Sequence, residues 1–234
     1  MTAQDRREAL RQRMEEDLAE DAARRDERAA STQHGDVATG PGWELRCGRW
    51  QDVLADVTSC DAVITDPPYS ERTVSGHRHG SAGSKGGPRQ TIGYRGFSED
   101  QTREITRFAC RVSRRYIVQW GDHVQFPWAE DEAALAGLFT FAPVPWVKSD
   151  GGTPRFTADG PASAIEWALV ARTKHWPPHR FRPGYYLTGS RRGSDGGISG
   201  GKPIDLMRAI VRDYSEPGDL VVDPCAGGGT TLLA

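Results

Sequence analysis

Long apolar runs are missing from this chain. No stretch of its 234 residues approaches the length of a membrane span, and residues 1–13 lack the apolar core of a secretory signal peptide. We therefore expect a soluble, cytoplasmic protein that has no membrane partner.

Paired cysteines are missing as well. Cys47, Cys60, Cys110 and Cys225 are scattered without a Cys-x-x-Cys pair, which argues against a disulfide framework and against a zinc site. The histidines also form no credible metal set. The sequence predicts reduced, mostly buried thiols and no bound metal.

The chain also lacks an excess of positive charge. The chain has 30 Lys and Arg residues against 32 Asp and Glu residues, so its net charge of -2 does not indicate a nucleic-acid binder. Any such binding would depend on local patches. Apolar residues make up 37% of the chain, which is enough for one sizeable core. We expect one main domain with an appendage.

Residues 1–42 form the expected appendage. Residues 4–30 are dense in Arg, Asp and Glu, and Leu10, Met14 and Leu18 recur at every fourth position. This spacing predicts one charged helix with a thin apolar stripe, suited to an arm for dimerisation or docking. Residues 31–42 have the composition of a linker.

Residues 43–234 alternate between strand and helix patterns, as an α/β domain does. A strand over residues 43–47, a helix over 50–57 and a strand over 61–65 predict a parallel unit with a crossover. Further strands are expected over residues 116–120, 139–148 and 164–171. Further helices are expected after a capping box formed by Ser98 and Gln101, over residues 130–138 and after Pro203.

The most informative short stretch is Asp66-Pro67-Pro68-Tyr69, which ends an apolar, β-branched run over residues 62–65. The run predicts a buried strand. Two prolines remove two backbone donors and stiffen the chain, so a carboxylate, a free carbonyl and an aromatic ring follow in a fixed order. That order suits a flat ring that bears an amino group. A proline turn with Tyr69 packed in the core fits these residues equally well.

Residues 71–96 follow this stretch and are dominated by Gly, Ser and basic residues, with few apolar anchors. We expect a mobile loop there, which is either a lid over the site or plain disordered chain.

A second basic segment covers residues 172–201. Between Arg172 and Ser194 there are eight Arg, Lys or His residues and no acid, interleaved with aromatic residues. Basic side chains neutralise phosphates and aromatic rings stack on bases, which favours nucleic-acid binding over a merely basic surface. The candidate nucleic-acid-binding residues are Lys174, Arg180, Arg182, Arg191 and Arg192.

The last stretch, residues 220–233, joins an apolar strand to a glycine turn and a helix start, as in sites for nucleotide-like ligands. The glycines permit close approach of the backbone, and the amides at the helix start favour an anionic group. A carboxylate beside them can hold an ammonium, which suits the methionine end of S-adenosylmethionine. The candidate cofactor-binding residues are Asp223, Pro224, Cys225, Gly227, Gly229, Thr230 and Thr231.

Two of these stretches resemble motifs of amino-group DNA methyltransferases, which modify adenine N6 or cytosine N4. Residues 63–69 are similar to the catalytic motif, and residues 221–231 to the S-adenosylmethionine motif Asp-Pro-Phe-x-Gly-Ser-Gly-Thr-Thr. Gly201-Lys202-Pro203 resembles the motif that precedes the latter, which adds Lys202 to the cofactor-binding candidates. The catalytic motif comes first and the cofactor motif last, with target recognition between them, as in the circularly permuted β group.

The resemblance implies a Rossmann-like methyltransferase fold with a mostly parallel sheet, and S-adenosylmethionine as cofactor. It implies that Asp66 and the Pro67 carbonyl accept hydrogen bonds from the exocyclic amine of a flipped DNA base, that Pro68 completes the motif, and that Tyr69 stacks on the base. Methyl transfer would be direct. The Asp form of the motif favours adenine N6; cytosine N4, RNA and a catalytically silent DNA-binding remnant remain alternatives.

The family's chain usually continues through a further helix and strand. Because this sequence ends at Ala234, we expect a truncated protein, a fragment, or a chain completed by another polypeptide, with homodimerisation as the other option. The resemblance also implies a bacterial or phage protein with a restriction-modification role.

Overall fold

The computed structural model describes residues 32–78, 95–152, 161–174, 181–189 and 201–234. The chain divides into two compact units, residues 1–55 and 56–234. The charged helix predicted over residues 4–30 lies outside the described residues. In the described parts of the chain, no helix combines the length and apolar character that crossing a membrane requires.

The first unit contains a small hairpin and a short helix. β1 (Val37–Gly40) pairs antiparallel with β2 (Trp43–Arg46), and α2 (Trp50–Val53) follows. Gly42, between the two strands, has a φ of 80°, which glycine adopts without strain.

The partner of β2 corrects one expectation. The strand predicted over residues 43–47 does not begin a parallel unit with residues 61–65, because it takes β1 as its antiparallel neighbour. The compact units divide after Ala55, and the domain boundary expected after Gly42 stays a prediction.

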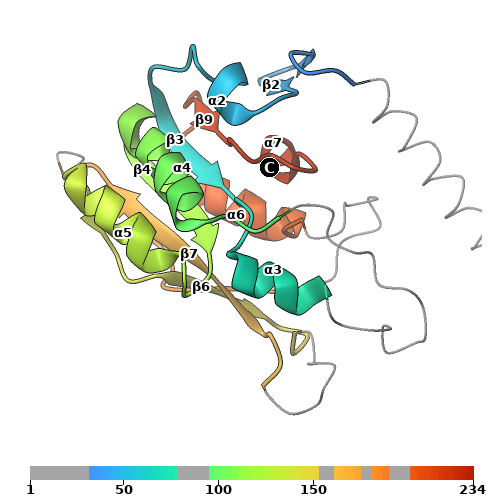
Figure 1. The fold of residues 1–234 in the computed structure, drawn as a ribbon, viewed down its shortest axis with the longest axis vertical. Helices are drawn as coiled ribbons and strands as arrows, with labels where there is room; N and C mark the ends of the chain where they lie inside the picture. Colours follow the sequence, from blue (N-terminus) through green and yellow to red (C-terminus); the bar gives the residue numbers. More distant parts are fainter. Residues whose placement is uncertain (1–31, 79–94, 153–160, 175–180, 190–200) are drawn as a thin grey trace, which may run out of the picture. The chain divides into compact units, whose positions relative to one another are not determined.

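The second unit is an α/β domain built on a sheet whose seven described strands follow the order β8-β6-β7-β4-β3-β9, with β5 paired to β7 (Figure 1). The strands are β3 (Cys60–Thr65), β4 (Ser113–Gly121), β5 (Phe139–Thr140), β6 (Val144–Lys148), β7 (Ile165–Arg172), β8 (Tyr186–Thr188) and β9 (Val221–Val222). The helices are α3 (Glu71–Arg78), α4 (Glu99–Val112), α5 (Phe126–Leu135), α6 (Ile204–Tyr214) and α7 (Thr230–Leu233).

Six of the seven described strands of the sheet run in one direction, and β7 alone runs against them. β4, β3 and β9 run parallel to one another, whereas β7 runs antiparallel to both β4 and β6. The α/β class and the mostly parallel sheet are both confirmed, with β7 as the one reversed strand among those described. The carboxyl ends of β4, β3 and β9 meet at one edge, which is where open α/β sheets bind ligands.

Helices cover both faces of this sheet. On one face, Ile64 and Trp120 share a buried cluster with Ile210 of α6. On the other face, the Thr106 hydroxyl of α4 donates to Gln119 at 3.1 Å, and α5 lies beside α4 (Figure 1). Burying one such isoleucine contributes roughly 1.5–3 kcal/mol. With both faces packed, the strand ends are the part of the sheet left for a site.

Two helix starts follow from local chemistry. The predicted capping box is present, because Gln101 N donates to Ser98 Oγ at 3.3 Å and Ser98 N donates to Gln101 Oε1 at 3.0 Å. The helix predicted over residues 130–138 begins earlier, at Phe126. Asp122 Oδ1 accepts hydrogen bonds from the N–H groups of Val124 and Gln125, which stabilises an earlier first turn.

The expected loop over residues 71–96 begins as a helix, α3, and residues 79–94 lie outside the described part. The helix is anchored at its start because the Thr73 hydroxyl donates to Asp122 at 2.6 Å and Val74 is buried. The Gly, Ser and basic residues of the segment gave no signal in the sequence for this short helix.

Candidate active site

The structure brings together two motifs that lie far apart in the sequence. β3 and β9 are adjacent parallel strands in which Val63 pairs with Val222. Asp66 follows β3 and Asp223 follows β9, so both carboxylates stand at the carboxyl ends of neighbouring strands. A ligand placed between these ends would face both motifs.

The two oxygens of Asp66 differ. Oδ2 accepts a hydrogen bond from Lys202 Nζ at 2.6 Å, whereas Oδ1 is buried and has no hydrogen-bond partner among the described residues. Burial raises the pKa of Asp66, and the charge of Lys202 works in the opposite direction. A carboxylate that has one oxygen bound to Lys202 and the other without a partner can accept a hydrogen bond from an external N–H group.

Tyr69 is held by its hydroxyl group. The hydroxyl donates to Glu166 Oε2 at 2.8 Å and accepts from Lys202 Nζ at 3.2 Å. Burial, together with the negative charges of Asp66 and Glu166, keeps the pKa of Tyr69 well above its usual range. The phenol therefore stays neutral, and its ring is fixed beside Asp66.

A charge network links these residues. The Lys202 ammonium lies 3.2 Å from Glu166 Oε2 and 4.8 Å from the centroid of the Trp120 ring, and the Lys148 ammonium lies 2.8 Å from Glu166 Oε1. Although burial opposes it, the two lysines lower the pKa of Glu166 to about 2. Burial works against the charged form of Lys202 too, but Asp66 and Glu166 raise its pKa. The network therefore pairs two lysine side chains with two carboxyl groups.

The carboxyl end of β4 supports the same motif from another direction. Asp122 Oδ2 accepts from the Ser70 N–H at 3.1 Å and from the Ser70 hydroxyl at 2.5 Å. Gln125 Nε2 donates to the Pro68 carbonyl at 3.0 Å. Burial opposes ionisation of Asp122, yet the hydrogen bonds from Ser70, Thr73 and the Gln125 backbone lower its pKa. This carboxylate fixes the backbone after Asp66.

The glycine loop is organised by its own residues. Asp223 Oδ1 accepts from the Cys225 N–H at 3.0 Å, and Oδ2 accepts from the Thr231 hydroxyl at 2.6 Å. Gly227 and Gly229 have φ angles of 52° and 76°, which side chains other than glycine seldom adopt. Burial raises the pKa of Asp223 to about 6, and the nearby charge of Asp66 adds to this shift.

Cysteine chemistry plays no part in this arrangement. All four cysteines are free, and burial, together with the neighbouring charge of Asp223, raises the pKa of Cys225 to about 12. At neutral pH it is a thiol, which is a poor nucleophile. Among the described residues, no group of His, Cys, Asp and Glu could hold a metal ion.

The structure does not bring all of the predicted site residues together. Lys202 lies with Asp66, where the sequence had grouped it with the glycine loop. The Arg182 guanidinium lies 4.3 Å from the Tyr116 ring centroid, and its Nε donates to the Asp213 carbonyl at 2.6 Å, so it packs between the sheet and α6. Lys174 is exposed after β7. Arg180, Arg191 and Arg192 lie outside the described residues.

Sequence reasoning missed four supporting residues: Lys148, Glu166, Asp122 and Gln125. A signal existed for Glu166, because it shares the inward face of β7 with Ala168 and Val170, where an acid requires a partner. Asp122 had a weaker signal as an acid directly after a buried strand. No signal in the sequence distinguished Gln125 or Lys148.

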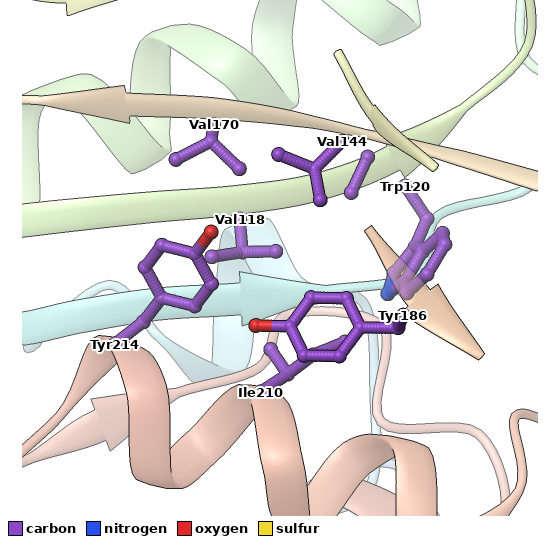
Figure 2. Close-up of a pocket in the computed structure, with 8 residues that line it drawn as sticks. Val118, Trp120, Val144, Val170, Tyr186, Ile210 and Tyr214 are labelled. Carbon is purple, nitrogen blue, oxygen red and sulfur yellow. The ribbon is translucent and has the colours of Figure 1, made fainter. Parts of the chain in front are cut away.

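A pocket lies between α6 and the sheet. Figure 2 shows Ile210 and Tyr214 of α6 pointing toward Val118 and Val170 of the sheet, with Trp120 at one end. Its lining is aliphatic and aromatic and belongs to the buried core. The pocket is therefore part of the core, and Trp120 both lines it and contacts Lys202.

Comparison with known proteins supports the interpretation of the glycine loop and of the fold. Residues 188–234 match the family model described as DNA methylase. No curated protein matches the chain.

Three solved structures illustrate the similarity in fold. The M1.HpyAVI-SAM complex is 19% identical with a TM-score of 0.55, covering 79% of this chain and 82% of that one. TTHA0409 from Thermus thermophilus, a putative DNA modification methylase, is 20% identical with a TM-score of 0.51, covering 80% of each chain. PvuII DNA methyltransferase, which is cytosine-N4-specific, is 15% identical with a TM-score of 0.56, covering 80% of this chain and 76% of that one. The chain therefore has the α/β fold of S-adenosylmethionine-dependent DNA methyltransferases.

Proposed function

We propose that this chain is an S-adenosylmethionine-dependent DNA methyltransferase that acts on an exocyclic amino group, with adenine N6 as the favoured target. The observation that carries the proposal is the position of Asp66 and Asp223 at the ends of adjacent parallel strands. The match of residues 188–234 to a DNA methylase family supports it. So does the motif order of the circularly permuted β group.

The residues present fit the cofactor. Asp66 and Asp223 are half-buried carboxylates whose pKa values are raised, and Asp66 Oδ1 has no hydrogen-bond partner among the described residues. Such a pair favours a ligand with positive charge, and the glycine loop allows its backbone to approach the ligand closely. Asp223 and the loop through Thr231 would hold S-adenosylmethionine, which supplies an electrophilic methyl group.

The chain's own residues then position the substrate. Asp66 Oδ1 accepts a hydrogen bond from the amine of a flipped base, and its carboxylate stabilises the positive charge that develops on the nitrogen. Tyr69, fixed through its hydroxyl, offers its ring for stacking on that base. Exposed basic residues such as Lys174 contact phosphates. Holding base and cofactor in this geometry supplies most of the rate enhancement.

The test is transfer of a labelled methyl group from S-adenosylmethionine to mixed-sequence duplex DNA, followed by digestion to nucleosides. The expected product is N6-methyladenine. Label in N4-methylcytosine would change the target base, and label only with an RNA substrate would change the nucleic acid. Absence of label when calorimetry confirms cofactor binding would favour the silent DNA-binding protein instead.

A further inference from the structure

Lys202 contacts three polar side chains of the charge network. Its ammonium lies 2.6 Å from Asp66 Oδ2, 3.2 Å from the Tyr69 hydroxyl and 3.2 Å from Glu166 Oε2. Only 6% of its side chain is exposed. All three donor positions of the ammonium therefore have an acceptor, and the lysine is unavailable to bind a ligand directly.

Both carboxylate oxygens of Glu166 are also engaged in contacts within the network. Its Oε1 pairs with Lys148 at 2.8 Å, and its Oε2 accepts from Tyr69 and lies beside Lys202. Lys148 fixes one end of this carboxylate, so the other end has a defined position. The direction of the Tyr69 hydroxyl and the place of the Lys202 ammonium follow from it.

The consequence is an asymmetric acceptor at Asp66. Because Lys202 occupies Oδ2, the carboxylate is not free to rotate, and Oδ1 is the oxygen left to accept a hydrogen bond. One acceptor at a fixed direction aligns the amine nitrogen with the methyl donor better than two exchangeable oxygens.

We propose that Lys202 and Glu166 are positioning residues for methyl transfer: they lock the Asp66 carboxylate and the Tyr69 ring, and leave Asp66 Oδ1 as the single acceptor for the target amine. This inference rests on the proposed function, and it assigns a task to buried Lys202 and half-buried Glu166, which act through Asp66 and Tyr69.

Electrostatics give the arrangement a measurable signature. The groups that face Asp66 are Lys202 before α6, Glu166 on β7, Tyr69 after β3, and Asp223 and Cys225 after β9. Burial raises the pKa of Asp66, Lys202 lowers it and Glu166 raises it. Removing the charge of Lys202 and removing that of Glu166 therefore shift the titration of Asp66 in opposite directions.

The experiment measures the pH dependence of methyl transfer in Lys202→Met, Lys202→Arg and Glu166→Gln. In Lys202→Met the acid limb of kcat moves to higher pH, with a loss on the order of tenfold or more at neutral pH that recovers at alkaline pH. Lys202→Arg keeps the charge and keeps the limb in place. Glu166→Gln retains an acceptor for Tyr69 and moves the limb to lower pH.

A second readout does not depend on activity. Titration of the Asp66 carboxylate by carbon NMR in the whole protein shows the same opposite shifts. Lys148→Met, which removes a cation from Glu166 but not from Asp66, is the matched control and produces the smallest shift. Unchanged titration in both Lys202→Met and Glu166→Gln overturns the inference, even if wild-type protein methylates DNA. Lack of methylation by the wild type with the NMR shifts intact would instead count against the proposed function.

Discussion

The two halves of the candidate site are held in different ways. The segment from Asp66 to Ser70 is fixed by residues from distant elements: Lys202 before α6, Glu166 on β7 and Asp122 after β4. The glycine loop is fixed by its own neighbours, since both donors to Asp223 lie within eight residues of it. One half depends on the completed domain, and the other half depends on local turn chemistry.

The difference extends to the carboxylates. The carboxylates that support the catalytic motif, Glu166 and Asp122, have lowered pKa values, about 2 for Glu166, because cations or several donors face them, whereas burial raises the pKa of Asp66 itself. On the loop side, burial raises the pKa of Asp223 to about 6. The supports of the catalytic motif are therefore in place before a ligand binds. The Asp223 carboxylate lacks a cationic partner in the described part of the chain, and we expect the ligand to supply that positive charge.

The largest effect is expected for Asp66→Ala. It removes the open acceptor and should lower kcat for methyl transfer on the order of 10²–10³-fold, the scale of losing one preorganised electrostatic contact. Cofactor binding, measured by calorimetry, should remain. Asp205→Ala is the control, because Asp205 is exposed on α6. Near-normal activity in Asp66→Ala would remove Asp66 from the chemistry.

The second largest effect is expected for Asp122, which follows β4 and supports the catalytic motif. Asp122→Ala leaves the Ser70 and Thr73 hydroxyls and several N–H groups without their acceptor, and should lower the free energy of unfolding by about 2–4 kcal/mol. Because the folded pKa of Asp122 is lowered, its contribution is present above the unfolded pKa and is lost as pH falls through the folded one.

Urea denaturation at several pH values checks this prediction. The deficit of Asp122→Ala relative to wild type should be full at pH 7 and should shrink in acid. A deficit that does not change with pH would mean that packing, and not the charge of Asp122, holds the segment after Asp66.

The features that could be predicted from the sequence are those that depend on residues close together in the chain. The capping box of α4, the strand that ends at Asp66 and the glycine turn at Gly229 depend on residues close in the chain, and each was predicted. The pair of Lys202 with Asp66 joins residues 136 positions apart, and its geometry depends on the order of strands in the sheet. Sequence reasoning found both residues but could not place them together.

A third prediction separates folding from binding at Asp223. The folded pKa of Asp223 is raised above its unfolded value, so its effect on stability is most favourable below the unfolded pKa and is lost as pH rises through about 6. Affinity for a cofactor ammonium should change in the opposite direction, falling roughly tenfold as Asp223 protonates below pH 6. Asp223→Asn should remove both pH dependences.

Calorimetry of S-adenosylmethionine binding between pH 5 and 8, together with thermal unfolding, measures these two effects. Glu166, with its pKa near 2, should add no pH dependence in this range. Parallel loss of affinity and stability on acidification would show that the loop unfolds, and would contradict a direct role for Asp223.

The smallest effect tests whether the loop depends only on local geometry. Gly229→Ala forces a side chain into a φ of 76°, which costs about 1–2 kcal/mol and is partly offset by a stiffer unfolded chain, leaving about 1 kcal/mol. Its Cβ would meet nothing closer than Leu232 at 3.6 Å, so conformational strain is the whole effect.

Gly218→Ala is the matched control, because Gly218 has a φ of 91° and open space around it in the turn before β9. Both substitutions should lower stability by similar amounts, but only Gly229→Ala should weaken cofactor binding. Gly229→Asn should recover part of both losses, since Asn tolerates this conformation better. Neither glycine variant should shift the titration of Asp66 as far as Lys202→Met does, because the charges of Lys202 and Glu166 act on Asp66 most strongly.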